Sequence, residues 1–272
     1  METASGSEPG RGDARKPRGR RPPVGEPLLD KAFRILETFS DNGPSLTLTQ
    51  LSAATGIPIS TAFRISQNLV RHGALEQADS GEYAIGLRLL ELATLAPRGH
   101  GLRHTALPFM EDLHRATGQH VLLGVRDGDA VVLTERLSAT KAAEVDYRVG
   151  GRMPLHATGI GLVLLAHSPT ALCEAYLRRE LEDDTGQPVS SKVLRERLGE
   201  IRVSGVAHNR RTQPAPAWSV AAPVMHRGRV VAALSVVAAD GSADARGVEP
   251  AVVAIARGVS RELDRTRLQD DS

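Results

Sequence analysis

Cysteine and aromatic residues are scarce in this chain. The eight Phe, Tyr and Trp residues among 272 are too few to form the stacking platforms on which sheet-based RNA-binding domains hold single-stranded bases. The single cysteine, Cys173, excludes an internal disulfide and a thiolate zinc cage. We therefore expect a protein of a reducing compartment that holds no structural metal and no cofactor.

Long apolar runs and a strong net charge are also missing. The longest hydrophobic stretches, around 160–166 and 230–239, are too short to cross a bilayer, and the N-terminus has no apolar core of the kind a secretion signal needs. We expect a cytoplasmic protein with no membrane partner. A composition of 41% hydrophobic and 24% charged residues, with a net charge of +2, is globular, and the length suits two domains.

Positive charge is concentrated near the N-terminus. Residues 11–21 carry six Lys or Arg residues against Asp13, among Gly and Pro and without apolar periodicity. Residues 1–27 are therefore predicted to be a disordered basic arm. Such an arm adds salt-sensitive affinity for a polyanion; the alternative is a flexible tail without consequence.

A helical apolar pattern begins directly after the arm. It ends at the turn sequence 41–44, which predicts a first helix buried on one side. The apolar stripe consists of Leu28, Leu29, Ala32, Phe33, Ile35, Leu36 and Phe39.

The next segment has the pattern of a helix-turn-helix. Thr47 to Gln50 matches a capping box, and the short helix that follows ends at Gly56. The Ile57-Pro58 pair prevents helical continuation and restarts the chain before a third helix over about 59–72. Two short helices joined by such a turn are typical of a helix-turn-helix.

The third helix is predicted to carry a nucleic-acid-binding face. Its inward positions are expected to be Ala62, Phe63, Ile65 and Leu69. The opposite side has hydrogen-bond donors and no carboxylate: Ser60, Thr61, Arg64, Gln67, Asn68 and Arg71. In a major groove Arg reads guanine, Asn or Gln reads adenine, and hydroxyls contact phosphates or base edges. We predict that this face, with Thr47 and Thr49 at the preceding helix start, binds double-stranded DNA; an ordinary solvated helix face is the alternative.

Two short strands around a turn follow the third helix. Residues 75–77 and 83–85 flank the turn sequence 79–81, which predicts a wing. Ser80 at its tip is a candidate phosphate contact, and a simple turn residue is the equally good alternative.

The collinear order of these segments resembles the IclR-type (isocitrate-lyase-regulator-like) transcription regulators. The resemblance covers 28–268 and is carried by LTLTQLSAATGIPISTAFRISQNLVRHGALEQADSGEYAIGLRLLELA, RVGGRMPLHATGIGLVLLA and WSVAAPVMHRGRVVAALSV. It implies a winged helix-turn-helix over 28–85, a linker helix over 86–97, and a GAF-like effector-binding domain over 98–268 before a tail at 269–272. It also implies a homodimer or dimer of dimers on a palindromic operator, with repression as the commoner outcome.

The second domain is expected to have an α+β fold. The pattern predicts strands at 120–126, 130–136, 143–149, 220–225 and 230–237, and helices at 102–117, 161–167, 171–179, 191–203 and 248–268.

The segment from Thr158 to Gly161 is the best candidate for a small-molecule site. It opens a helix whose free amides and positive dipole end favour an anion. The resemblance implies an effector pocket formed by this segment and the strand pair near the C-terminus, with hydroxyls from two serines and an apolar wall. The predicted effector residues are Met153, Thr158, Gly159, Ile160, Gly161, Asn209, Ser219, Ser235 and Val237. A helix start inside a domain core is the alternative.

Two departures from the family pattern bear on the effector. Leu162 stands where many members have a lysine, and 208–212 is basic where relatives commonly carry acids. The two arginines of that segment favour a more anionic ligand if they point inward; otherwise they are surface residues.

No catalytic signature appears in the sequence. A Walker loop, HExxH, GxSxG and paired cysteines are all missing, and Leu164 replaces the third glycine of a dinucleotide fingerprint. We therefore expect a regulator and not an enzyme. The alternative is an enzyme or small-molecule-binding protein whose N-terminal helices mediate protein association, with Ser219, Ser235, His156 and Cys173 as its loose candidates; His156 is expected to be structural.

Overall fold

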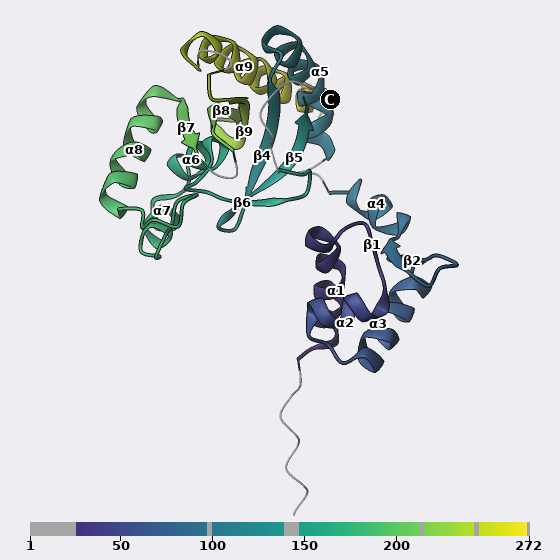
Figure 1. Ribbon diagram of the computed structural model, residues 1–272. Coiled ribbons are helices and arrows are strands. Elements are labelled where there is room, and N and C mark those ends of the chain that lie inside the picture. Colours follow the sequence, from purple (N-terminus) through teal and green to yellow (C-terminus); the bar gives the residue numbers. More distant parts are fainter. Residues whose placement is uncertain (1–25, 97–99, 139–146, 213–214, 242–244, 271–272) are drawn as a thin grey trace, which may run out of the picture. The chain divides into compact units, whose positions relative to one another are not determined.

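The computed structural model describes residues 26–96, 100–138, 147–212, 215–241 and 245–270 (Figure 1). Contacts divide the chain into two compact units, Met1–Leu89 and Leu90–Ser272, which we call the N-terminal and C-terminal units. The predicted basic arm, apart from its last two residues, lies outside the described residues, as does the start of the predicted strand at 143–149.

The N-terminal unit is a winged helix-turn-helix, as predicted. Its small antiparallel sheet has the order β1-β3-β2. Strand β1 was missed by the sequence analysis because two residues are too short to show a period. The elements are α1 (Leu28–Asn42), β1 (Ser45–Leu46), α2 (Leu48–Thr55), α3 (Ile59–Arg71), β2 (Leu75–Gln77) and β3 (Tyr83–Ile85).

The turn between α2 and α3 is built by local sequence. The predicted capping box is present. The backbone N–H of Gln50 donates to Thr47 Oγ1 at 3.3 Å, and the backbone N–H of Thr47 donates to Gln50 Oε1 at 2.8 Å. Gly56 ends α2 in the left-handed region at φ 66°, which glycine adopts without steric cost. Pro58 then precedes the first turn of α3, and its fixed φ favours that helix start.

Two predictions of inward-facing residues are wrong. On α1, Ile35 and Phe39 are buried, but Leu28, Leu29 and Phe33 are 59%, 70% and 61% exposed. On α3, Phe63 is 49% exposed. The helical step of about 100° places residue 63 on the flank between the buried and polar sides, and the fully buried Ser66 takes the inward position instead. The core is formed by Ile35, Phe39, Leu46, Leu51, Ile57, Ala62, Ile65, Leu75 and Tyr83.

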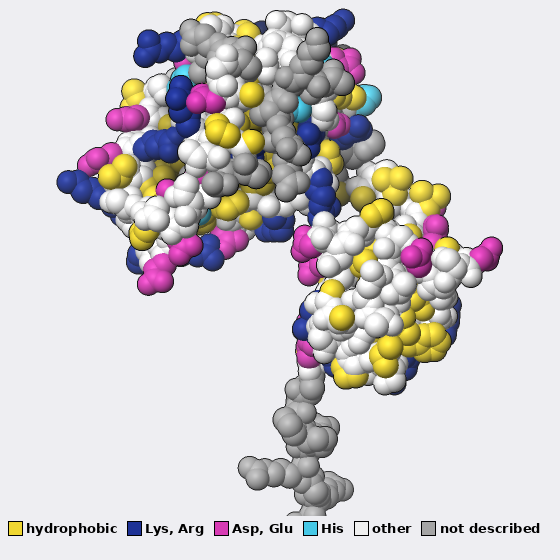
Figure 2. Space-filling view, viewed as in Figure 1, with side chains coloured by type: hydrophobic (Ala, Val, Ile, Leu, Met, Phe, Trp, Pro, Cys, Tyr) yellow, Lys and Arg dark blue, Asp and Glu magenta, His cyan; other side chains and the backbone are white. Residues whose placement is uncertain are grey.

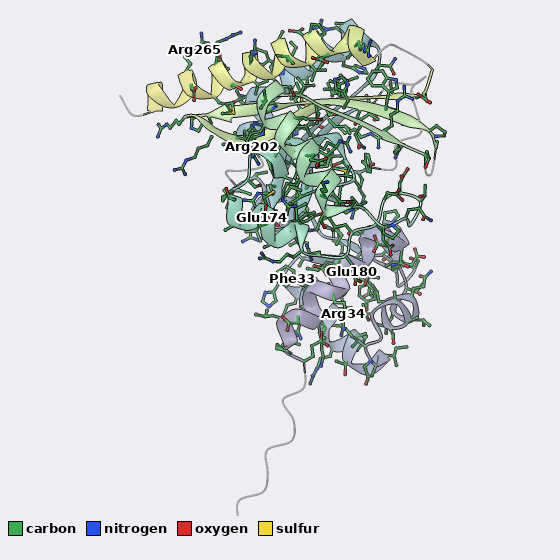
Figure 3. All side chains as sticks on the ribbon, turned by 90° about the vertical axis from the view of Figure 1, so that its left-hand side faces the viewer. Phe33, Arg34, Glu174, Glu180, Arg202 and Arg265 are labelled. Atoms are coloured by element: carbon green, nitrogen blue, oxygen red, sulfur yellow. The ribbon has the colours of Figure 1, made fainter. Side chains whose placement is uncertain are left out.

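The C-terminal unit has the predicted α+β fold. A six-stranded antiparallel sheet of order β6-β5-β4-β9-β8-β7 forms its centre. Helices α5 and α9 lie on one face, with α9 along the strands, and α6 to α8 lie on the other side (Figures 1 and 3). The elements are α5 (His100–Thr117), β4 (His120–Asp127), β5 (Ala130–Leu137), β6 (Arg152–Pro154), α6 (Gly159–Ala166), α7 (Thr170–Leu177), α8 (Ser191–Ser204), β7 (Ala207–Arg211), β8 (Ala217–His226), β9 (Arg229–Ala239) and α9 (Ala245–Asp270).

Two strands differ from the sequence prediction. The described residues 147–149 form no strand, and the short β6 at Arg152–Pro154 pairs with β5 instead. Strand β7 was not predicted, because the sequence AHNRR has no run of apolar residues. It pairs along the edge with β8, with Asn209 opposite Ser219.

Helix α4 (Leu87–Ala93) crosses the boundary between the two units, at the place predicted for a linker helix. None of its residues is buried. Within the described ranges, no helix is long and apolar enough to cross a bilayer.

Candidate DNA-binding face and effector pocket

The polar face of α3 is accessible and rich in donors. Ser60, Arg64 and Arg71 are exposed, while Gln67 and Asn68 are half-buried, as is the predicted Thr61. Among the described residues, the guanidinium groups of Arg64 and Arg71 have no hydrogen-bond or ion-pair partner. Two arginines without protein partners on a helix that contains no acid suit contacts with base edges and phosphates.

Two of the predicted base-reading side chains are held by the protein. Gln67 Nε2 donates to Gln77 Oε1 at 3.1 Å and to the Tyr83 hydroxyl at 3.2 Å, which ties α3 to the wing. Asn68 Nδ2 donates to the Arg64 carbonyl at 2.9 Å. These amides must exchange partners to bond a base, whereas the Arg64 guanidinium need not.

The remaining predicted DNA contacts lie at the start of α2 and in the wing. The Thr47 hydroxyl is engaged in the capping box, where it donates to Gln50 Oε1 at 2.9 Å, and Thr49 is exposed. Ser80 donates to Glu82 Oε2 at 3.4 Å. The wing, 75–85, contains three acidic residues and no Lys or Arg. It therefore offers a phosphate no positive charge, and α3 is the better source of phosphate contacts.

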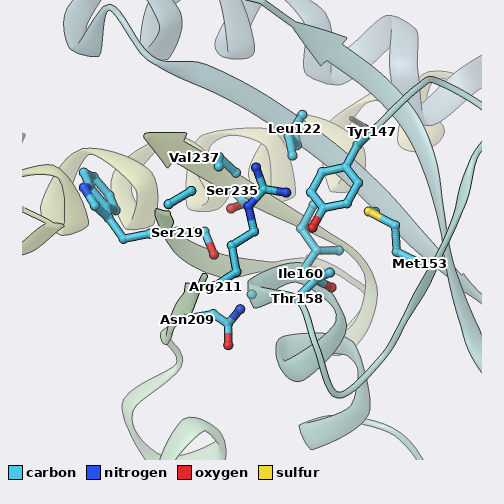
Figure 4. A pocket seen from close by; sticks show the side chains of 13 residues that line it. Leu122, Tyr147, Met153, Thr158, Ile160, Asn209, Arg211, Ser219, Ser235 and Val237 are labelled. Carbon is cyan, nitrogen blue, oxygen red and sulfur yellow. The ribbon is translucent and has the colours of Figure 1, made fainter. Parts of the chain in front are cut away.

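A pocket lies in the C-terminal unit between the sheet and the start of α6 (Figure 4). All predicted effector residues except Gly161 line it. Of the two arginines in 208–212, Arg211 lines the pocket, whereas Arg210 is exposed outside its lining. Four other lining residues were not predicted: Leu122, Tyr147, Ala217 and Trp218. The full lining is Leu122, Tyr147, Met153, Thr158, Gly159, Ile160, Asn209, Arg211, Ala217, Trp218, Ser219, Ser235 and Val237.

The two glycines at the start of α6 are required for different structural reasons. A Cβ on Gly161 would lie 2.4 Å from the Leu155 carbonyl oxygen, so this glycine permits close packing against the preceding loop. A Cβ on Gly159 would lie 2.8 Å from Ser219 Oγ and so intrude on the pocket. Of the two, Gly159 alone leaves room for a ligand.

The polar groups of the pocket are positioned by their neighbours. Thr158 Oγ1 accepts the Gly161 amide at 3.0 Å and so caps α6. Asn209 Nδ2 donates to the Ala157 carbonyl at 3.0 Å, and its Oδ1 accepts from Arg197 Nη2 at 3.1 Å. Burial lowers the pKa of this Arg197.

The two pocket serines differ in their hydrogen bonds. Ser235 Oγ donates to the Val236 carbonyl at 3.2 Å. The Ser219 hydroxyl is largely buried and has no hydrogen-bond partner among the described residues. The Ser219 hydroxyl can therefore form a hydrogen bond with a ligand without first losing one to the protein.

Among the described residues that line the pocket, Arg211 is the one with a charged side chain. Its guanidinium carbon lies 5.3 Å from the centre of the Tyr147 ring, and both side chains reach into the pocket (Figure 4). The free space within the pocket is about 20 Å³, which is room for about one water molecule. A ligand of the size of an aromatic ring therefore requires lining side chains to move.

The part of the pocket that the structure describes can hold an anion but offers no acid–base pair. None of the described lining residues is an Asp, Glu, His or Cys. The ring nitrogens of His156 are bonded to the Tyr176 hydroxyl at 2.7 Å and the Glu182 carbonyl at 2.8 Å, which fits the predicted structural role. Cys173 is buried, and burial raises the pKa of its thiol. The described residues contain no cluster of three or more His, Cys, Asp or Glu side chains suited to a metal ion.

Comparison with known proteins places both units in one family. Residues 28–79 match the IclR helix-turn-helix domain, and residues 95–265 match the family of bacterial transcriptional regulators named for the IclR C-terminal domain. The transcriptional regulator XynR of Escherichia coli is 33% identical over 76% of this chain and 84% of its own. The glycerol operon regulatory protein of Streptomyces coelicolor is 30% identical over 87% of this chain and 94% of its own.

Solved structures show the same fold. An IclR homologue from Microbacterium hydrocarbonoxydans, crystallised in complex with 4-hydroxybenzoate, matches with a TM-score of 0.80 and 31% identity over 87% of this chain and 99% of its own. IclR of Thermotoga maritima matches in fold with a TM-score of 0.70 over 87% of this chain and 98% of its own, at 24% identity. The capped helix-turn-helix, the α+β domain and these matches agree, and the chain belongs to the IclR family of DNA-binding transcriptional regulators.

Proposed function

We propose that this protein is a repressor that binds a specific double-stranded operator as a homodimer or dimer of dimers and is released by a small anionic effector. Its work on operator DNA would place it in the cytoplasm. The observation that supports this effector class is the described lining of the pocket, whose one charged side chain is Arg211 and which includes no carboxylate. A buried anion needs such a partner to offset its desolvation.

The predicted effector residues divide into an anion-binding side and an apolar side. Arg211, Ser219 and the start of α6 at Gly159 offer charge and hydrogen bonds, while Met153 and Val237 offer apolar surface. A small aromatic carboxylate has both features. The complex of the Microbacterium homologue with 4-hydroxybenzoate supports this class of ligand.

The proposed function is regulatory and not catalytic, because the relatives are named as regulators. Among the described lining residues, Tyr147 and Arg211 are the ionisable groups, so none of them is a general base that would activate Ser219 or Ser235 as a nucleophile at neutral pH.

The effector class can be tested by thermal unfolding of the full chain with 4-hydroxybenzoate and its neutral analogue 4-hydroxybenzamide. At a concentration about 100 times Kd, a ligand stabilises the folded state by about 2.7 kcal/mol, which raises Tm by roughly 5–10 °C for a domain of this size. We expect that rise with the carboxylate and not with the amide. Arg211→Ala should abolish it, whereas Arg210→Ala should keep it, because Arg210 is exposed, pairs with Asp240 and lies outside the pocket lining.

Two results would contradict the proposal. Equal shifts with the carboxylate and the amide would show that charge does not decide binding, and an unchanged shift in Arg211→Ala would remove Arg211 from the site. The sign of regulation is tested separately: an effector that raises the affinity of the protein for its DNA would contradict release of a repressor.

A further inference from the structure

Two large apolar side chains are exposed on α3, the helix with the donor-rich face. Ile59 is 51% exposed and Phe63 is 49% exposed. They are four residues apart, so they lie one above the other along the helix, and Gln67 continues the same row. Ile59 and Phe63 are not part of the buried core of the N-terminal unit, whereas Gln67 is tied to the wing by its hydrogen bonds.

The apolar row lies directly beside the row that contains Ser60 and Arg64. At about 100° per residue, Phe63 is about 40° from Gln67 and about 100° from Arg64 around the helix axis. The buried residues Ala62, Ile65 and Ser66 define the core side of α3, and Phe63 lies on the flank between that side and the donor-rich face. A helix that brings Arg64 to a base edge in the major groove therefore brings Phe63 to a neighbouring base pair.

The chemistry of the groove identifies one partner for an apolar side chain. Thymine presents a C5-methyl group in the major groove, and apolar contact with that methyl distinguishes it from the other bases. Helix α3 contains no acidic residue that would repel the DNA beside this contact.

We infer that Ile59 and Phe63 read thymine methyl groups and are specificity-determining residues of this protein. The inference rests on the DNA-binding part of the proposed function. Arg64 is expected to make polar contacts with a base, and Ile59 and Phe63 would add apolar contacts that select thymine by its methyl group. The operator is accordingly expected to carry thymine next to the base pair bonded by Arg64.

The test compares thymine with uracil, which differ by that methyl alone. Duplexes are first selected from a random-sequence pool by the full-length protein, and each thymine of the selected site is then replaced in turn by uracil. At one or two positions we expect uracil to weaken binding by wild type about fourfold, the effect of losing one buried methyl-sized group. Phe63→Ala or Ile59→Ala should weaken binding to the thymine duplex and remove the difference at its own position.

A matched control is Val203→Ala on α8, because Val203 is 92% exposed and lies outside the N-terminal unit. This variant should keep the full thymine preference. Helix content and Tm of Phe63→Ala are expected to be unchanged, since the side chain is half exposed and alanine favours helix.

Three results would overturn the inference. They are equal binding of thymine and uracil duplexes by wild type, an undiminished uracil effect in both variants, and loss of self-association by Phe63→Ala in the absence of DNA, which would assign the row to an interface between copies. A selection that yields no sequence-specific duplex at all would instead overturn the regulator proposal together with this inference. The two failures are therefore distinguishable.

Discussion

Replacing Arg64 by alanine is expected to weaken operator binding by about 1–3 kcal/mol, roughly 5- to 150-fold, and to relax the sequence preference at one base pair. Arg64 is exposed at the middle of the donor-rich face of α3, and among the described residues its guanidinium has no protein partner. It can thus form a bidentate contact with a guanine without first breaking another bond. Gln67 and Asn68 lack that advantage.

The measurement for Arg64 is a titration of matched and single-base-substituted duplexes, with Arg71→Ala for comparison. Arg71 is exposed at the end of the same helix, so its loss should weaken all sequences alike and reduce the salt slope by about one. Arg210→Ala, in the C-terminal unit, should leave both quantities unchanged. A footprint and base preference in Arg64→Ala identical to those of wild type would remove this residue from base recognition.

Replacing Leu87 and Leu90 together by glutamine is expected to separate the proposed dimer and to weaken binding to a full palindromic site about 100-fold or more, because a linked second half-site adds that much avidity. These leucines are 63% and 61% exposed, and Leu92 and Leu95 are 51% and 76% exposed. Hydrophobic side chains gather on the surface over α4 (Figure 2). A surface of this kind marks an interaction site.

Helix α1 offers a second exposed apolar surface that could contribute to the proposed dimer interface. Leu28, Leu29 and Phe33 are all more than half exposed, and Phe33 lies on the surface of α1 (Figure 3). We propose that a second copy of the chain covers the exposed residues of α1 and α4. Glutamine is chosen for the substitution because it introduces no acid that would itself repel DNA.

Sedimentation and DNA titration together test the dimer. The double variant should sediment as a monomer and bind a full site no better than an isolated half-site. Val203→Gln, at a still more exposed apolar position on α8, should behave as wild type. A variant that remains a dimer with full operator affinity would assign the interface to other residues.

Local signals were sufficient to predict the helix-turn-helix. The capping box at Thr47 and the Ile57-Pro58 break each act within a few residues, so the structure follows them closely. The orientation of Phe63 was predicted wrongly, since assigning core positions from hydrophobic periodicity treats each apolar residue of a helix as buried, and Phe63 is 49% exposed. An apolar side chain that works at an interface has no distinct signature in one sequence.

The effector pocket was only partly predictable for a different reason. Asn209 and Arg211 reach it because β7 pairs with β8, opposite Ser219 and Ala217, and pairing between distant segments is not visible in composition. The alternation of a strand places both side chains on one face. That signal was available in 207–211, but its polar sequence concealed the strand.

The glycine-rich sequence at the start of α6 could not show which of its glycines lines the effector pocket. Gly159 and Gly161 were predicted together as effector residues, yet the Leu155 carbonyl explains Gly161 by packing alone. Only the arrangement of the loop before the helix separates the two roles.

Sequence-specific DNA binding is tested most directly by an anisotropy titration of the purified full-length protein with the DNA flanking its own gene, at two salt concentrations and with excess random competitor DNA. We expect saturable binding that survives the competitor and weakens with salt by a slope set by the phosphate contacts. Binding that disappears with competitor or modest salt would contradict it, because only non-specific attraction by basic residues would then remain.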